Sequence, residues 1–448
     1  MLNVKEAEAR AARLVEAATK AGADAADVLY VGDASTGVQV RLGALEDVER
    51  SEGETIGLRF FIGRRSATIS SSDLSDDAMT ALVDRAAAMA REAPEDPWAG
   101  LAPQDRLLTG PGPDVEGDDG RDPSPVELKE RAFAIEDAAR AVAGVTNSEG
   151  AGVSAGRSVI ALATSHGFCR GYSTSGYSAS ASVIAGTGGD MQRDYESHSV
   201  RHYADLDSDE LIGRRAGEKA VRRLGSGKID SGVMPVIFDP RVGGGLVGSL
   251  IDAIKGAAIA RGTSFLIGRE DEALFPQAIR IVDDPHRRRG LRSKPFDGEG
   301  LPTAPRDLVR DGRITGWLMD SATARQLNLE PTGHASRGVG GSPGASATNV
   351  ALLPGEVSPD ELIAEVKLGL YVTELIGQGV NPVTGDYSRG ASGFVIENGA
   401  ITRPVQEITI ASNLIDMYRT LVAASDLEYR RGTNVPTLRV EGMTVAGA

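Results

Sequence analysis

Two histidines, His198 and His202, are the only histidines in this 448-residue chain that lie close enough in sequence to share a ligand. On a helix, this spacing would place both rings on one face, where they could hold one metal ion. The surrounding segment, Tyr195 to Tyr203, instead alternates as a strand does, and an i,i+4 pair on a strand is about 13 Å apart. Hydrogen bonding at a surface or interface is therefore the favoured role of both side chains, with a metal site as the alternative.

A glycine-rich segment, Gly243 to Gly248, follows an apolar strand and opens a helix, so its position resembles that of a phosphate-binding loop. The lysine and the Ser or Thr of a P-loop are missing, and the glycine spacing meets the dinucleotide-binding pattern only loosely. Close packing between the strand and the helix is the favoured explanation.

Two further motifs are better explained by local structure than by a functional site. Gly152-Val-Ser-Ala-Gly156 fits G-x-S-x-G, but a nucleophile elbow needs a helix after the serine, and a strand-like run follows here. Arg287 to Arg289, with Arg292, form the densest basic cluster, and Phe296 is the one aromatic residue nearby. A solvated loop or a contact with acidic groups is favoured over a nucleic-acid groove. The residues alone thus reveal no catalytic constellation.

The composition excludes several classes of function. Lys and Arg number 48 against 63 Asp and Glu, and the net charge of −15 disfavours direct nucleic-acid binding. The single Cys169 cannot form an internal disulfide, which suits a reducing compartment. The most apolar helical stretch, Leu246 to Ala260, is too short to span a bilayer and contains Asp252 and Lys255. We therefore expect a cytoplasmic protein that binds no membrane.

The order of the predicted elements divides the chain into four parts. Residues 1–106 read as a helix, several short strands and a second helix, and residues 126–227 repeat that order. Residues 107–125 have no periodicity and are rich in turn formers and acids, which predicts a linker. Residues 228–448 read mostly as strands. The predicted fold is α+β, with two similar N-terminal helix/antiparallel-sheet units followed by a larger, sheet-rich C-terminal domain.

Local signals locate particular elements within these parts. The strands of the first unit are expected as separate short runs, among them Asp27–Val31 and Gly37–Arg41, and a helix is expected over Gly245–Ala260. Asp311-Gly312 and Asn398-Gly399 have the composition of hairpin turns with positive φ.

Three C-terminal motifs carry a resemblance to a known family. Gly379-Val-Asn-Pro-Val-Thr-Gly-Asp-Tyr-Ser-Arg-Gly-Ala391 is the specific one, and Gly393–Gly399 and Glu407–Met417 support it. With Arg261-Gly-Thr-Ser264 and Gly341-Ser-Pro-Gly344, they make the chain similar to the TldD/PmbA family over nearly its whole length. The likeness is greatest to the PmbA (TldE) branch, and some members of the family carry the older label of DNA gyrase modulators.

The resemblance implies a degenerate metal site. In the family, the TldD branch is a zinc peptidase with H-E-x-x-x-H on a helix and a Cys ligand near the C-terminus. Counting back from Arg261 aligns that motif with Val247 to Asp252, so Val247 and Asp252 replace the histidines and Gly248 replaces the general-base glutamate. Ser425 to Pro436 contain no cysteine. A hydrolytic zinc needs about three protein ligands and a base, so we expect neither catalytic residues nor a metal in this chain.

The resemblance also implies a partner. PmbA-type chains are similar to the non-metal half of a one-to-one assembly with TldD, which would hold the zinc and cleave small unfolded peptides, including leader peptides. Sheet edges of the C-terminal domain are expected to help receive extended peptide, with Asp386, Tyr387 and Arg389 as candidates for the substrate wall or the interface. The alternative for Asp386 and Arg389 is that they stabilise a turn after Pro382.

Other functions stay open at this point. The chain could act alone as a peptidase through an unrecognised site, or as a binding protein that regulates gyrase or another target. It could also form a homodimer when its partner is scarce.

Overall fold

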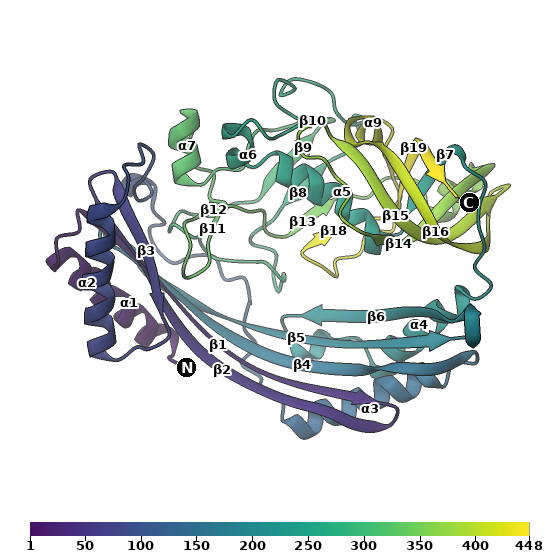
Figure 1. Cartoon of the computed structure of the whole chain (residues 1–448), viewed down its shortest axis with the longest axis horizontal. Helices are drawn as coiled ribbons and strands as arrows, with labels where there is room; N and C mark the ends of the chain where they lie inside the picture. The colour runs from purple at the N-terminus through teal and green to yellow at the C-terminus, as the bar shows by residue number, and fades with distance from the viewer. Residues whose placement is uncertain (448) are drawn as a thin grey trace.

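A long, curved antiparallel sheet forms the N-terminal half of the molecule (Figure 1). The computed structural model describes residues 1–447. The sheet has six strands in the order β3-β2-β1-β4-β5-β6. Their bounds are β1 (Ala25–Arg41), β2 (Ala44–Ile62), β3 (Arg65–Ser71), β4 (Val145–Thr164), β5 (Cys169–Ala185) and β6 (Gln192–Val200).

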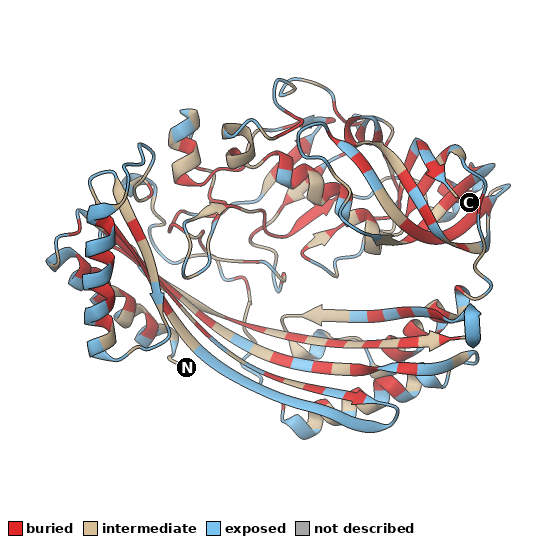
Figure 2. Cartoon of the chain, in the orientation of Figure 1, coloured by how far each residue is buried: buried red, intermediate tan, exposed pale blue. Residues whose placement is uncertain are grey.

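Four helices cover the convex face of this sheet (Figure 1). They are α1 (Val4–Lys20), α2 (Asp76–Glu92), α3 (Pro125–Arg140) and α4 (Asp209–Arg222). Each has an Asn or Ser N-cap whose side chain accepts a hydrogen bond from a backbone N–H of the first turn. Their small apolar residues pack on alternate strand residues in two separate cores. Figure 2 shows the buried positions along these strands and helices. Among residues 1–447, no helix combines the length and the apolar composition that crossing a bilayer requires.

The two N-terminal units have the same element order, helix, three strands, helix. They are joined in one sheet because β1 pairs with β4 from Asp27–Thr164 to Val40–Ala151. The strand order is therefore symmetric about the β1–β4 pair. The predicted α+β class, with repeated N-terminal units and a sheet-rich C-terminal part, is confirmed.

The strands are longer than the sequence predicts. Asp27–Val31 and Gly37–Arg41 were expected as separate strands, but both lie within β1, which continues through Gly32, Asp33 and Ser35. These residues are paired on both sides, to β2 and β4. Pairing with two neighbours thus outweighs the weak strand propensity of Gly, Asp and Ser.

The C-terminal part is built on two larger sheets. One has the order β16-β15-β14-β7-β19-β17, and an additional β16–β19 pairing closes five of its strands into a small barrel. Its strands are β7 (Gly232–Phe238), β14 (Leu368–Ile376), β15 (Asp386–Glu397), β16 (Ala400–Asn413), β17 (Val422–Ala423) and β19 (Leu438–Ala446). The Asn398-Gly399 turn between β15 and β16 has the predicted positive φ at both residues, 50° and 81°.

The second sheet has the order β10-β9-β8-β13-β18, and a two-stranded ribbon, β11–β12, lies apart from it. The bounds are β8 (Ile281–Asp283), β9 (Arg306–Arg310), β10 (Arg313–Ile314), β11 (Ala335–Ser336), β12 (Gly344–Ala345), β13 (Val350–Leu352) and β18 (Thr433–Asn434). Asp311 and Gly312, with φ of 51° and 73°, form the predicted turn between β9 and β10. The C-terminal helices are α5 (Pro240–Ala253), α6 (Gly256–Ala260), α7 (Ser321–Leu327), α8 (Pro359–Ala364) and α9 (Leu414–Arg419), and three short 3₁₀ turns span Gln104–Arg106, Gly188–Asp190 and Tyr203–Asp205.

The prediction of a single helix over Gly245–Ala260 is wrong, because the helix is interrupted between α5 and α6. At the break, Lys255 is extended and the Gly256 N–H donates to the Leu318 carbonyl at 2.8 Å. A Cβ on Gly256 would lie 2.4 Å from the Met319 sulfur. The helix therefore ends where a neighbouring segment approaches too closely for it to continue.

Segment 107–124, which covers most of the predicted linker, connects the two halves by backbone hydrogen bonds. The Leu108 N–H donates to the Gly300 carbonyl in the C-terminal part, and the Ser175 N–H of β5 donates to the Gly117 carbonyl. The segment is thus held between the sheet and the C-terminal part (Figure 1).

The two halves also meet near the start of the sheet, at what we call the closed junction. Asp27 of β1 contacts both Arg59 of β2 and Arg337 of the C-terminal part, and all three are almost completely buried. Close approach is possible because Gly57 has no side chain: a Cβ there would lie 1.8 Å from the Val339 carbonyl oxygen.

Candidate functional site

Helix α5 carries Val247, Gly248 and Asp252, the positions that the resemblance aligns with the family's zinc motif. It begins five residues earlier than predicted, because Asp239 caps it by accepting from the Arg241 N–H at 2.9 Å and Pro240 occupies its first turn. Its apolar face, including Leu246 and Leu250, packs into the core of the C-terminal part.

The three motif positions do not provide a zinc site. Val247 is buried in the core, and Gly248 faces open space. Asp252 is exposed and accepts from Lys255 Nζ at 2.7 Å. Valine and glycine offer no side-chain donor, and a single carboxylate falls short of the ligand set that zinc takes. These residues therefore do not fit a zinc ion. Across residues 1–447, no three His, Cys, Asp or Glu side chains are arranged to hold a metal.

His198 and His202 have separate partners. His198 Nδ1 accepts from the Asp207 N–H at 3.1 Å, and His202 Nε2 contacts the Glu116 carbonyl at 2.9 Å. Burial is the main cause that lowers the pKa of His198 below its usual value. The structure therefore brings each histidine to its own hydrogen bond.

The residues of the remaining sequence motifs take part in strand pairing, packing and ion pairs. Ser154 lies in the middle of β4, paired on both sides, where no nucleophile elbow exists. Of the glycine-rich segment, Gly243 packs closely, since a Cβ there would lie 3.1 Å from Val435. In the basic cluster, Arg289 pairs with Glu116 and Asp205.

The three candidate wall residues occupy different environments on β15. Asp386 is exposed and accepts from Thr384 Oγ1 at 2.6 Å and from Asn413 Nδ2 at 3.2 Å, contacts that stabilise the preceding turn. Tyr387 is buried in the core, and burial raises its pKa to about 12. Arg389 is half-buried and lines a cavity.

That cavity, here named the β6 cavity, has a volume of about 480 Å³. It lies where the edge strand β6 of the N-terminal sheet approaches α5, β14 and β15 of the C-terminal part (Figure 1). Its lining residues are Arg193, Asp194, Tyr195, Arg223, Arg241, Val242, Gly245, Thr373, Glu374, Leu375 and Arg389.

A network of ion pairs joins the two halves beside this cavity. Asp194 of β6 accepts from Arg241 of α5 in a bidentate contact, with N–O distances of 2.7 and 3.0 Å. Arg223 lies 3.6 Å from Asp194 and 2.6 Å from Glu374. Burial opposes ionisation of Asp194, yet the hydrogen bonds and charge of Arg241 lower its pKa below the usual value. The network therefore stays ionised at neutral pH.

Unused hydrogen-bonding groups remain at the β6 cavity. Thr373 is the extra residue where the β14–β15 register shifts, and such bulges redirect side chains. Its hydroxyl is buried and has no hydrogen-bond partner in the described chain, and the same is true of Arg241 Nε. Arg389 donates only a long hydrogen bond, 3.4 Å, to the Ile376 carbonyl, and pairs with no carboxylate in residues 1–447.

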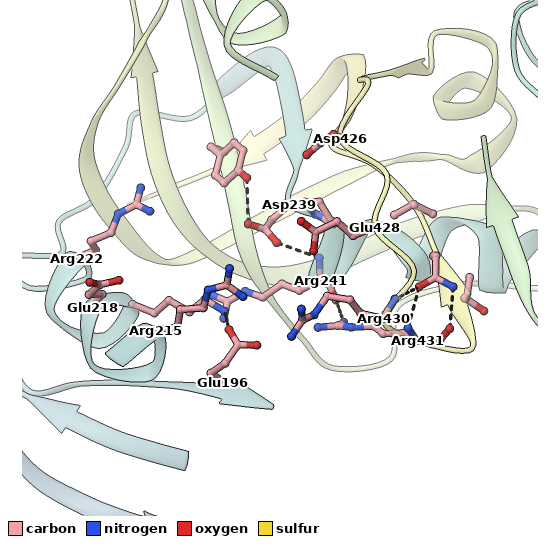
Figure 3. A pocket seen from close by; sticks show the side chains of 16 residues that line it. Glu196, Arg215, Glu218, Arg222, Asp239, Arg241, Asp426, Glu428, Arg430 and Arg431 are labelled. Carbon is pink, nitrogen blue, oxygen red and sulfur yellow. Dashed lines mark hydrogen bonds and ion pairs between the residues drawn. The ribbon is translucent and has the colours of Figure 1, made fainter. Parts of the chain in front are cut away.

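A second cavity, of about 450 Å³, lies on the other side of Arg241 (Figure 3). Arg215, Glu218 and Arg222 project into it from α4, and the loop with Glu428 and Arg430 forms the opposite wall. Several of its charged groups are already paired, as Lys219 is with Glu196 and Arg430 with Asp207. Positive and negative charges are more nearly balanced in this cavity than in the β6 cavity.

Sequence reasoning missed most of the β6 cavity. Its charged residues are scattered from Arg193 to Arg389, in segments that no local pattern connects. The one available signal was Asp239-Pro240, a helix start that would have placed Arg241 in the first turn of α5.

Comparison with known protein families identifies the class of protein. Three sequence models match in order: PmbA/TldA metallopeptidase domain 1 at residues 26–90, the central domain at 118–224 and the C-terminal domain at 231–447. The chain belongs to the PmbA/TldD metallopeptidase family, and the resemblance inferred from its motifs is confirmed.

Individual relatives support this assignment over the full length. Metalloprotease PmbA of Escherichia coli O157:H7 is 37% identical over 95% of this chain and 92% of its own. A PmbA homologue of Haemophilus influenzae is 36% identical over 100% and 98%. A crystal structure from Bacteroides thetaiotaomicron, of a candidate modulator of DNA gyrase, superposes with a TM-score of 0.91 at 26% identity and covers both chains completely.

Proposed function

We propose that this chain is the metal-free subunit of a two-chain peptidase, whose partner is a TldD-type subunit that carries the zinc. The observation that carries the proposal is the chemistry of α5, where valine, glycine and an exposed aspartate occupy the positions of the family's ligands and base. A member of a metallopeptidase family that lacks these groups needs a second chain to supply the water-activating metal. We place the assembly in the cytoplasm, which suits the single free cysteine.

A surface for a second chain is available on the N-terminal sheet. β3 pairs only with Ile56–Ile62 of β2, so the outer edge of β2 from Ala44 to Thr55 has no strand partner in residues 1–447. This half of β2 is exposed (Figure 2), and Leu42, Leu45 and Val48 present apolar side chains at its tip. Unpaired edges with exposed apolar residues are surfaces to which another chain can add.

The substrate we propose is a small unfolded peptide, including leader segments. Main-chain pairing accepts many sequences, because it uses groups that every residue has. The C-terminal barrel is closed by the β16–β19 pairing, whereas β6 is an edge strand beside a cavity. The Tyr195 N–H on β6 donates to its neighbour Asp194 at 2.8 Å rather than to a strand. We therefore assign peptide reception to the β6 edge, together with Arg389.

Reconstitution tests the proposal. This chain and a TldD-type relative with an intact H-E-x-x-x-H motif are purified separately, mixed, and examined by size and metal content, with cleavage of a flexible peptide as the activity. We expect a one-to-one complex, zinc in the TldD-type chain alone, and cleavage only by the mixture. Chelator-sensitive cleavage by this chain alone would contradict the proposal and favour a self-sufficient peptidase. Absence of a complex, with binding to gyrase or another regulator instead, would favour a stand-alone binding protein.

A matched pair of variants examines the proposed contact surface. Val48→Lys places a charge among the apolar residues at the tip of β2, and Ser51→Lys makes the same change of charge at an exposed neutral residue further along the strand. We expect the first variant to weaken assembly more than the second. Equal assembly by both would move the interface elsewhere.

A further inference from the structure

The β6 cavity has an excess of positive charge in a protein that is acidic overall. Four arginines line it against two carboxylates, whereas the whole chain has a net charge of −15. The pairs inside the network use Arg241, Arg223 and Arg193 to hold Asp194 and Glu374. Arg193 also pairs with Glu149, outside the lining, so the one guanidinium of the lining without an acidic partner in residues 1–447 is that of Arg389.

Two buried atoms at the same place lack the hydrogen bonds that buried polar groups normally make. They are the hydroxyl of Thr373, a residue only 7% exposed, and Arg241 Nε. A buried hydroxyl without a partner is costly, so native structures rarely retain one unless it has a use. A cavity lined by a guanidinium without an acidic partner, with an unpartnered hydroxyl buried in its wall, is suited to an oxygen-rich anion.

From this arrangement we propose that the β6 cavity binds a carboxylate of the peptide substrate, with Arg389 and Thr373 as its recognition residues. This inference rests on the proposed function, which supplies an extended peptide at the β6 edge. A guanidinium matches the two oxygens of a carboxylate in a planar, bidentate contact, and a hydroxyl adds one further donor. A volume of about 480 Å³ is within the range of cavities that hold small ligands.

The position of the cavity explains how a peptide would reach it. Tyr195 is 42% exposed and lies on β6 at the cavity, with its ring 5.9 Å from the Arg241 guanidinium carbon. A peptide that adds to the β6 edge would pass this ring and place its next carboxylate near Arg389. That group is either the C-terminal carboxylate or an acidic side chain, since both present the same two oxygens.

Binding of defined peptides to the full chain tests the inference. The probes are three labelled flexible hexapeptides of Gly, Ala and Ser: one with a free C-terminal carboxylate, one with a C-terminal amide, and one amide with a single internal Glu. Fluorescence anisotropy measures their dissociation constants. We expect at least one carboxylate-bearing peptide to bind about tenfold more tightly than the plain amide, the size of one charge-assisted contact. Which of the two does so identifies the source of the carboxylate.

Two variants and a control connect that preference to the proposed residues. Arg389→Met should abolish the preference, and Thr373→Val should reduce it severalfold without loss of folding, since it replaces an unpaired hydroxyl by a methyl group. Arg85→Met, at an exposed arginine on α2, should leave the preference unchanged. Equal binding of all three peptides, or a preference that survives Arg389→Met, would overturn the inference.

Failure of this inference differs from failure of the proposed function. If the chain assembles with a TldD-type subunit and supports cleavage but shows no carboxylate preference, only the role of the cavity is wrong. If the preference is present but no such assembly forms, the carboxylate site stands and the subunit role is wrong.

Discussion

The N-terminal sheet meets the C-terminal part at two ionic junctions that use the same residue types differently. At the closed junction, Asp27 accepts from Arg59 Nε at 3.0 Å and from Arg337 Nη1 at 2.6 Å, and the three side chains are at most 8% exposed. At the β6 cavity, Asp194 is held by Arg241 and Arg223, but an open space adjoins them.

The difference teaches what an open space adds to a buried ion pair. In the closed junction both guanidiniums pair with the same carboxylate, Asp27, so the cluster holds the two halves together. At the β6 cavity, Arg389 and the Thr373 hydroxyl remain unused. Arginine–carboxylate contacts thus hold the two halves together at the closed junction. At the β6 cavity, one arginine is left over for the ligand proposed above.

Removing the shared carboxylate of the closed junction should have the largest effect. Asp27→Asn leaves two buried guanidiniums without a counter-charge, which we expect to cost about 3–5 kcal/mol of unfolding free energy. Urea titration measures the loss, with Asp47→Asn, at an exposed position of β2, as the control. A loss no larger than that of the control would remove the distinction between the two junctions.

Glu299, whose charge interacts with that of Arg59, predicts a pH dependence. Burial, followed by the nearby charge of Asp297, raises the pKa of Glu299 from its usual 4.5 to about 7, and Arg59 lies close enough to oppose this. Between pH 4.5 and about pH 7, Glu299 is therefore protonated in the folded protein but ionised in the unfolded chain. The free energy of unfolding falls as pH rises through this range, by about 3 kcal/mol in all.

Glu299→Gln should abolish this loss, because glutamine stays neutral and can still accept from Ser321. The variant should match the parent at about pH 4 and exceed it above pH 7. Unfolding free energies measured across this range test the effect, with the exposed Glu270→Gln as the control. Parallel pH profiles for parent and Glu299→Gln would refute the assignment.

The corresponding change at the β6 cavity should cost less. Asp194→Asn removes the carboxylate that holds Arg241, but Arg223 keeps its contact with Glu374 and the adjoining cavity gives water access, so we expect a loss of about 2 kcal/mol. The measurement is the same urea titration as for Asp27→Asn. A loss equal to that of Asp27→Asn would mean that the cavity offers these arginines no solvation.

The smallest effect should be a gain. Thr373→Val replaces a buried hydroxyl that has no partner, so we expect stability to increase by about 1 kcal/mol. Thermal unfolding measures the gain, and Thr420→Val is a suitable control. The Thr420 hydroxyl donates to the Asp416 carbonyl at 3.2 Å, so its removal should lower stability. Loss of stability in Thr373→Val would show that the hydroxyl is already satisfied.

Much of the fold could be predicted because its signals are local. The caps of the N-terminal helices, the alternation of the strands and the turns at Asp311 and Asn398 each depend on a few neighbouring residues. The lengths of β1 and β4 could not be predicted, because both strands continue through Gly and Ser residues that pair with neighbouring strands. The break before Gly256 depends on Leu318, which is distant in sequence.

The sequence by itself determined that Val247 and Gly248 offer no imidazole, thiolate or carboxylate, because this is a matter of composition. It also determined the family, through motifs that are contiguous along the chain. Only the tertiary structure decided that Arg389 faces a cavity with Thr373 and Arg241, while Tyr387 enters the core. The physical reason is that a binding site depends on which groups remain unpaired after folding, and that is settled by contacts among distant segments.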